Sequence, residues 1–528
     1  MPLNTLLRRA FVYTPPGDGA HAFAITPSPS PQESEDTPQA LTASLEDNLR
    51  ALSTRFHAPQ NRDFVMRRFA IGTAACALVF LEGMSDRQAV GMLTMSGLLS
   101  ESQLGELEPE AMLDAACAHG IRAGEVKIEA QLDALESAVL SGQAVFCIEG
   151  AARALIVDVR GFEKRAIGTP QNESVIEGSQ EGFTEDLRTT ITQIRRLVRA
   201  GALVTEFIPV GSRAPLNCAL MYLADVANPS IIEEARRRLA CIDDDHTPGV
   251  GFIQQFIEDA PDSWIPQTVQ TERPDRAAAF LLEGQVLMAC DGAPKVLAAP
   301  TTFWNILHTS DINYMRRPLG SFEMALRMVG IVVSLCLPAG YLALVLHHPE
   351  TIPSEMLMTI LTTHLQVPFA STTELLLMLL AYDLILEAGT RVPGVLGSTI
   401  SIVGALILGQ AAVSAKLVSS VLITIVATTG LGSFCVPDYQ TGIAIRMYRY
   451  VLIVFAAAWG LIGIWTALLL GVGYLASLSS FGVPLLSPIV PRNDDGGDAL
   501  FHSPVTQGTH RPAYLYPLRQ RKRKGRKP

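Results

Sequence analysis

TELLLMLLAYDLILE, residues 373–387, has the apolar character of a membrane helix, yet it carries three carboxylates. Charged side chains inside a membrane usually mark an ion or proton pathway, a pairing site or a water-lined wall. At about 100° per residue, Asp383 and Glu387 share one helix face, whereas Glu374 lies nearly opposite. All three are candidate ion-pathway residues, and Asp383 with Glu387 is the better pair.

The same stretch also fits a helix whose acids lie only at its ends. Pro368 precedes Ser371-x-x-Glu374, which has the spacing of a capping box. Carboxylates near helix ends cost little free energy. In this interpretation one acid caps the helix and the others lie among lipid headgroups, and the sequence leaves both interpretations open.

Length and composition set the outline of the fold. The chain has 528 residues, of which 17% are charged, and its mean hydropathy is +0.27. It is too long for one domain, too apolar to be wholly soluble and too charged for a bare membrane bundle. We therefore expect an α/β soluble region of two similar subdomains plus an α-helical multi-span membrane domain.

The first residues predict a tail followed by an α/β region. Residues 1–52 include TPSPSPQESEDTPQ (26–39), a composition typical of a disordered segment. From residue 56 onward, short β-rich runs alternate with helical stretches. No apolar signal-peptide core follows the first arginines, so the first large domain is expected to stay in the cytoplasm.

The soluble region contains an internal repeat. ALVFLEGMSD (77–86) resembles ALMYLADVAN (219–228), and glycine turns at Gly142 and Gly150 recur at Gly284 and Gly292. The constant separation of 142 residues predicts two similar subdomains. Convergent strand–turn chemistry is the alternative. The expected ranges are subdomain 1 at 56–165, a linker helix at 184–204 and subdomain 2 at 205–305.

The membrane domain is expected at 320–485. Met324–Leu346 is its first clear span, because a helix needs about 20 apolar residues to cross a bilayer. The positions of arginines predict which helix ends face the cytoplasm, because arginines near membrane helices favour the cytoplasmic side. The apolar run Val451–Leu478 either exits or folds back. The expected arrangement is a fold-back at the Gly471/Gly473 end, which leaves the tail 486–528 inside. The cytoplasmic-side charges are Arg316, Arg317, Arg446 and Arg449.

Small residues recur every four positions in one membrane segment and clear a helix face for close contact. They can serve contacts within one chain or between chains, and Gly463, Ala467 and Gly471 repeat the pattern. Gln410 can donate a hydrogen bond across such an interface or act as an ordinary packing amide. The expected helix-packing residues are Gly397, Ser401, Ala405, Gly409 and Gln410.

Two charged segments and the cysteines also allow predictions. The basic segment 519–527 is expected to meet anionic lipid, not nucleic acid, because no aromatic reader accompanies it. The turn TERPDR (271–276) is interpreted as a helix start with surface salt bridges. Eight cysteines without CxxC spacing predict reduced thiols, no metal site and no disulfide framework. No catalytic motif or cofactor-binding loop is present, so we expect neither an enzyme nor a cofactor.

Several stretches, in one order from about residue 60 to 490, resemble the A subunits of GerA-type spore germination receptors. They are ESVIEGSQEGFTEDLRTTITQIRR (173–196), VANPSIIEEARRRL (226–239), QTERPDRAAAFLLEGQV (270–286), VPFASTTELLLM (367–378), EAGTRVPGVLGSTISIVGALILGQAAV (387–413), IRMYRY (445–450) and SFGVPLLSP (480–488). Matching single positions are Pro368, Phe369, Glu374, Glu387, Gly389, Pro393, Gly397, Gly404, Gly409, Gln410, Pro437, Arg446 and Arg449.

This resemblance implies a nutrient-sensing complex in the inner spore membrane. Its partners are membrane lipid, a transporter-like B subunit and a lipoprotein C subunit. The A subunit is expected to oligomerise, with a pentamer as the implied form, into a gated ion channel that releases cations. A non-conducting scaffold that relays nutrient binding is the alternative. Departures from the family pattern at Ala370, Leu379, Leu386, Ser414, Lys416 and Gly178-Ser179-Gln180 change mainly the charge of the membrane region.

Overall fold

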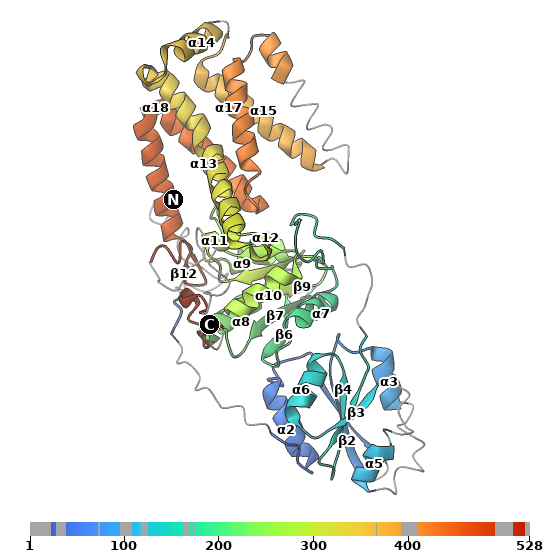
Figure 1. Ribbon diagram of the computed structural model, residues 1–528. Coiled ribbons are helices and arrows are strands. Elements are labelled where there is room, and N and C mark those ends of the chain that lie inside the picture. Colours follow the sequence, from blue (N-terminus) through green and yellow to red (C-terminus); the bar gives the residue numbers. More distant parts are fainter. Residues whose placement is uncertain are drawn as a thin grey trace.

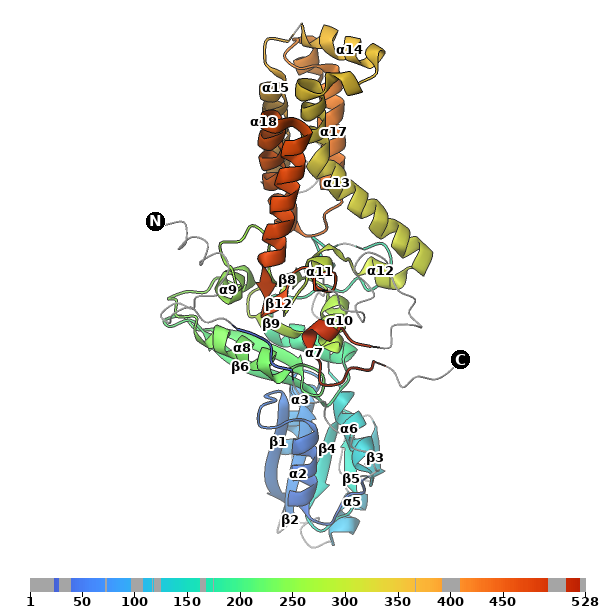
Figure 2. The same cartoon turned by 90° about the vertical axis from the view of Figure 1, so that its left-hand side faces the viewer.

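The computed structural model describes residues 23–27, 39–71, 74–95, 108–115, 117, 125–161, 168–173, 175–365, 367–391, 409–491 and 510–522. Two α/β units are stacked end to end below a group of long helices (Figures 1 and 2). We call them unit 1 (residues 45–157), unit 2 (187–299) and the helical part (317–477). Unit 2 lies in the middle and contacts both of the others.

Unit 1 is a five-stranded antiparallel sheet with the order β1-β2-β4-β5-β3. Helices α2 and α6 cover one face, and α3 and α5 cover the other. Strands β2 and β4 are apolar along nearly their whole length because both faces are buried. The elements are α2 Leu45–Arg55, β1 Phe64–Ile71, β2 Ala74–Leu81, α3 Arg87–Met95, α5 Pro109–Ala115, β3 Val126–Glu129, α6 Leu132–Leu140, β4 Ala144–Ile148 and β5 Ala154–Val157.

Unit 2 repeats this architecture with the strand order β6-β7-β9-β10-β8. Helices α7 and α10 cover one face, and α8 and α9 cover the other. Four elements of unit 1, α2, β2, β4 and β5, recur 142 residues later as α7, β7, β9 and β10. The elements are α7 Leu187–Leu197, β6 Leu203–Val210, β7 Leu216–Leu223, α8 Pro229–Ala240, α9 Val250–Ile257, β8 Val269–Thr271, α10 Pro274–Glu283, β9 Val286–Cys290 and β10 Val296–Ala299.

Both units begin one helix earlier than the sequence suggested. The prediction of a disordered tail at 1–52 is wrong for residues 45–52, because α2 buries Leu45, Leu49 and Leu52 against the sheet of unit 1. The helix expected as a linker at 184–204 is α7, which buries its apolar side in unit 2. In each unit the sheet has two apolar faces, and the preceding helix is needed to cover one of them.

A buried polar network joins the two units. Arg195 of α7 donates to Asp63 over 2.5 Å and to the Asn61 side chain over 2.9 Å. Asn61 in turn accepts from the backbone of Thr205 in β6. The side chains of Arg195 and Asp63 are 1% and 4% exposed. The contact therefore resembles a domain core more than a mobile linker.

Among the described residues of the helical part, two helices are long and apolar enough, by length and composition, to cross a membrane. These are α13 and α18, and α13 rises away from unit 2 in both views (Figures 1 and 2). The elements after unit 2 are α11 Phe303–Leu307, α12 Asp311–Tyr314, α13 Arg317–His347, η2 Pro349–Thr351, α14 Ser354–His364, α15 Ser371–Arg391, α17 Ser420–Ser433, α18 Tyr439–Ser477, β11 Ser479–Ser480, β12 Val483–Pro484 and η3 Ala513–Leu515.

Helix α18 is a hairpin of two helical arms. Gly460 interrupts it with φ 60° and ψ −138°, a conformation that favours glycine. Across this turn the Tyr448 hydroxyl donates to the backbone oxygen of Ala467, so the arms run antiparallel. The expected fold-back near Gly471 is therefore wrong, since the chain turns at Gly460. Gly471 instead lies in the second arm, against the Tyr448 ring.

The chain returns to unit 2 after the hairpin. Phe481 is buried in the core of unit 2, where the guanidinium carbon of Arg238 lies 4.1 Å from its ring centroid. Farther on, Leu518 donates its backbone N–H to Val226. The expected free tail at 486–528 is thus wrong for residues 510–522, which pack on unit 2.

Part of the basic segment also contacts protein carboxylates. Arg519 pairs with Asp225 at 2.9 Å, and Lys522 pairs with Glu283 at 3.2 Å. The lipid contact expected for 519–527 stays a prediction, because the side chains of Arg519 and Lys522 are still 61% and 34% exposed. Residues 523–527 lie outside the described part of the chain.

Candidate functional site

Asp383 and Arg449 form an ion pair between α15 and the first arm of α18. Arg449 donates to the two carboxylate oxygens at 3.2 and 3.0 Å, and the Tyr450 hydroxyl donates to Asp383. Arg449 is fully buried, while Asp383 is 21% exposed. Two guanidinium nitrogens of Arg449, Nε and Nη1, have no hydrogen-bond partner among the described residues. The carboxylate therefore balances a buried positive charge.

The expected cytoplasmic-side arginines lie in three different settings. Arg316 and Arg317 are exposed at the start of α13, next to unit 2, and Arg446 is half-buried. Arg449 is not a solvent-facing charge, because its side chain lies inside the helical part. A guanidinium at such a position needs a carboxylate partner, which Asp383 supplies.

Glu374 is fully buried near the end of the helical part that lies away from unit 2. Its carboxylate accepts from the backbone N–H of Ser419 and lies 3.3 Å from Nδ1 of His364. The other ring nitrogen of His364 lies 3.2 Å from the Tyr341 hydroxyl. Ser419 is the N-cap residue of α17. Glu374 therefore stabilises the start of α17, whereas the capping-box spacing predicted that it would cap its own helix.

Glu387, the third candidate acid, is exposed near the end of α15. Asp383 faces the first arm of α18, so the two acids do not share one environment despite their helical spacing. The structure places each acid in a separate setting: Asp383 is paired with Arg449, Glu374 lies beside His364, and the side chain of Glu387 is exposed.

Apart from Arg449, the partners of these acids were not among the sequence candidates. His364, Ser419 and Tyr450 complete the two buried clusters, but each is an ordinary polar residue near an apolar run. The available signal was the presence of Arg449 one turn beyond Arg446 in such a run. Which acid it meets depends on how α15 packs against α18.

The two small-residue stripes differ in what they contact. Gly397, Ser401 and Ala405 lie outside the described residues. A Cβ at Gly409 would meet no described atom within 4 Å, and Gln410 is exposed. In the second stripe, Gly463 lies against the backbone of Phe455 and Ala467 is buried. The second stripe therefore serves packing within the hairpin.

The TERPDR turn lies where unit 2 meets the helical part. Arg273 is 1% exposed and pairs with Asp275 at 2.7 Å, while Arg276 pairs with Glu173 at 2.5 Å. The expected surface salt bridges are therefore wrong, since these charges are largely buried. Although burial opposes it, hydrogen bonds from Asn172 and the charge of Lys295 hold the pKa of the neighbouring Glu272 carboxyl below its usual range.

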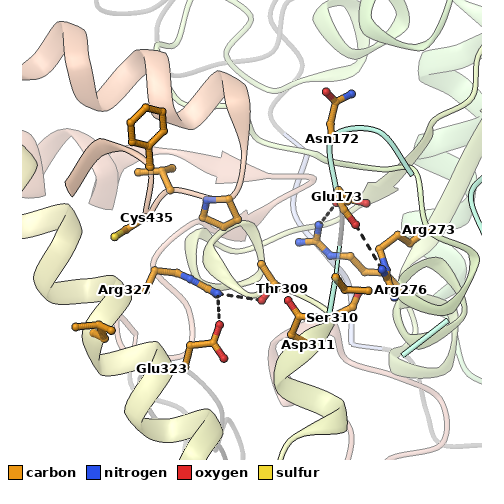
Figure 3. Close-up of a pocket in the computed structure, with 15 residues that line it drawn as sticks. Asn172, Glu173, Arg273, Arg276, Thr309, Ser310, Asp311, Glu323, Arg327 and Cys435 are labelled. Carbon is orange, nitrogen blue, oxygen red and sulfur yellow. Dashed lines mark hydrogen bonds and ion pairs between the residues drawn. The ribbon is translucent and has the colours of Figure 1, made fainter. Parts of the chain in front are cut away.

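A cavity of about 510 Å³ opens beside this turn. One wall consists of Arg273 and Arg276 of unit 2, residues 172–175 that precede this unit and residues 309–311 that follow it. The lower part of α13 with the turn between α17 and α18 forms the other wall (Figure 3). Arg327 of α13 crosses between the walls, because it donates to Leu307 and Thr309 and pairs with Glu323. The cavity thus lies between unit 2 and the helical part.

Comparisons with known proteins give a consistent result. The family model described as Bacillus/Clostridium GerA spore germination protein matches residues 50–514. The uncharacterized membrane protein YfkQ of Bacillus subtilis is 33% identical over 91% of this chain and 93% of its own. Spore germination protein KA of the same organism is 33% identical over 91% and 88%. The crystal structure of the N-terminal domain of the A subunit of the Bacillus megaterium spore germinant receptor GerK3 is 29% identical, with a TM-score of 0.41, and covers 51% of this chain and 98% of that one.

Proposed function

The chain belongs to the Bacillus/Clostridium GerA spore germination protein family, and from this premise we propose that it is a membrane subunit of a nutrient-responsive germination receptor. Its helical part forms a gated ion pathway in an oligomer and releases cations when germination starts. The lipoprotein C subunit and transporter-like B subunit are its partners. The proposed location is the inner spore membrane, with both α/β units on the cytoplasmic side.

The lengths of the helices support a multi-span arrangement. At 1.5 Å per residue, the 31 residues of α13 extend about 46 Å, which exceeds the bilayer core of about 30 Å. The turn at Gly460 divides α18 into arms of about 31 and 25 Å. The exposed Arg316 and Arg317 at the start of α13 favour the cytoplasm for this end.

The proposal of signal transfer rests on how the hairpin ends are held. Gln440 at the start of α18 approaches Gln254 of unit 2 at 3.4 Å. Tyr474 near its end donates to Ser263 at 2.9 Å. The first arm thus begins on unit 2 and the second arm ends on it. A shift of unit 2 would therefore tilt the hairpin as one body.

The single observation that supports the ion pathway is the Asp383–Arg449 pair between α15 and the first arm of α18, which we place inside the membrane. Charges inside a membrane bundle are expensive and are usually kept for function. Arg449 neutralises Asp383 within one chain, whereas the side chain of Glu387 is exposed on α15, so Glu387 is the acid that we place at a water-filled path between neighbouring copies. The paired Asp383 then sets the electrostatic potential beside that path.

The scaffold alternative is favoured by the same pairing. Asp383 and Glu374 both have protein partners, so they can serve solely to hold the helices together. Full-length protein in liposomes separates the two functions, with and without its partner subunits. A pathway releases entrapped potassium in at least one of these conditions. If intact oligomers release no potassium in either condition, the scaffold function is supported and the ion pathway is excluded.

Gly409→Leu is expected to weaken assembly without unfolding the chain, because no described atom lies within 4 Å of the added Cβ. Gly463→Leu is the matched control, since a Cβ there overlaps the backbone oxygen of Phe455 and should disrupt the hairpin itself. Cross-linking in membranes and thermal unfolding in detergent measure the two effects. A parent-like cross-linked ladder for Gly409→Leu would mean that this face contacts lipid.

A further inference from the structure

The cavity between unit 2 and the helical part is lined by many charged groups, whereas a simple packing defect is lined mainly by apolar groups. Its walls hold three arginines and three carboxylates, together with an apolar side formed by the turn after α17 (Figure 3). Large cavities with buried polar atoms are expected to hold water or a ligand. The pairing of these charges indicates which ligand fits.

Each arginine of the cavity already has a carboxylate partner. Arg276 pairs with Glu173 and also donates to the backbone oxygens of Asn305 and His308. Arg273 pairs with Asp275, and Arg327 pairs with Glu323. An incoming anion would have to displace these partners, so the arginines do not form an anion site.

Two acceptors in the cavity remain without donors. The Oγ of Ser310 and the Oδ1 of Asp311 are buried, and neither has a hydrogen-bond partner among the described residues. Ser310 is only 5% exposed. Burial raises the pKa of the Asp311 carboxyl and Glu323 acts in the same direction, and together they outweigh the lowering by Arg273 and Arg327. The environment of Asp311 therefore disfavours its charge, and a positive group would relieve this.

We propose that the cavity binds a small monovalent cation, an alkali-metal ion or a primary ammonium group, between Asp311 and Ser310. An ammonium group would donate hydrogen bonds to these two oxygens, and a hydrated alkali ion would be coordinated by them directly or through its water. Either one also supplies the positive charge. The volume of about 510 Å³ leaves room for hydration water or for the body of a small amine. A bound cation would lie at the start of α12, where Ser310 is the N-cap residue and Asp311 the first helical residue, independently of whether the helices conduct ions.

Cys435 provides a probe, because its thiol lies on the cavity wall (Figure 3). The full-length protein in detergent is treated with 2-aminoethyl methanethiosulfonate, a small ammonium reagent, or with neutral methyl methanethiosulfonate. Peptide mass spectrometry follows Cys435 separately from the other cysteines. The ratio of cationic to neutral reaction rates is expected to fall about threefold or more in Asp311→Asn, because a local negative charge is lost.

Competition identifies the cation. At constant ionic strength, potassium or methylammonium should slow the cationic reagent in the parent, relative to choline, and should lose this effect in Asp311→Asn and in Ser310→Ala. Stronger protection by potassium assigns an alkali ion, and stronger protection by methylammonium assigns an amine. Asp245→Asn is the control, because it removes the same charge from a side chain that is 67% exposed.

Two results would overturn the proposal. One is a rate ratio in Asp311→Asn equal to that of the parent and of Asp245→Asn. The other is equal protection by choline, potassium and methylammonium in the parent. Asp311→Asn, Ser310→Ala and Asp245→Asn all keep the side chain close to its original size. Thermal unfolding of each variant confirms that the reaction is measured on folded protein. Potassium release is not a readout here, so failure of this site leaves the proposed ion pathway untouched.

Discussion

Replacing Asp383 by asparagine is expected to destabilise the helical part and to lower cation release at the same time. Arg449 would remain fully buried without a negative partner, and breaking a buried pair in this way costs about 3–5 kcal/mol. The uncompensated guanidinium would also repel cations near α15. Thermal unfolding in detergent and potassium release from liposomes measure the two losses in the full-length chain.

Two further variants separate structural support from ion selectivity. Asp383→Leu with Arg449→Met removes both charges and is expected to regain most of the lost stability. Glu387→Gln removes an exposed acid from the same helix and is expected to lower cation release with little change in stability. A parent-like melting temperature for Asp383→Asn would show that the pair carries no buried charge. Restored release in the double variant would make the pair purely structural.

The repeat in the soluble region could be predicted because its signals are local. Apolar strands followed by glycine turns recur at a fixed distance, and β2 and β7 occupy the positions that this distance requires. The helices before each sheet were missed for different reasons. Around α2, the Pro- and Ser-rich composition outweighed the spacing of Leu45, Leu49 and Leu52, which is that of an amphipathic helix. For α7, helical character was predicted and its packing was not.

The candidate site was predictable only in its parts. The carboxylates of α15 stand out because apolar helices rarely contain them. Their partners do not, since Arg449 is 66 residues from Asp383 in the chain and meets it only after α15 packs on α18. The turn of the hairpin was misplaced for a similar reason. Several glycines occupy this run, and only the backbone conformation distinguishes Gly460 from Gly471.

Arg195→Met is expected to loosen the contact between units 1 and 2 and to leave each sheet intact. The substitution keeps the length of the side chain but leaves Asp63, which is 4% exposed, without its cation. A cost of about 3 kcal/mol corresponds to a loss of roughly 100-fold in hydrogen-exchange protection. The amides of β1 and β6 report it, because Asn61 and Asp63 precede β1 and Thr205 lies in β6.

The matched control is Arg213→Met, whose ion pair with Asp245 has side chains 82% and 67% exposed. Exposed pairs contribute about 0–1 kcal/mol, so its exchange pattern should match the parent. Unchanged protection of β1 in Arg195→Met would show that the network does not hold the units together. If protection falls as expected, units 1 and 2 move as one body in the parent. The hairpin ends on unit 2 then transmit that motion to α18, and loss of Arg195 should weaken signalling without altering any residue of the helical part.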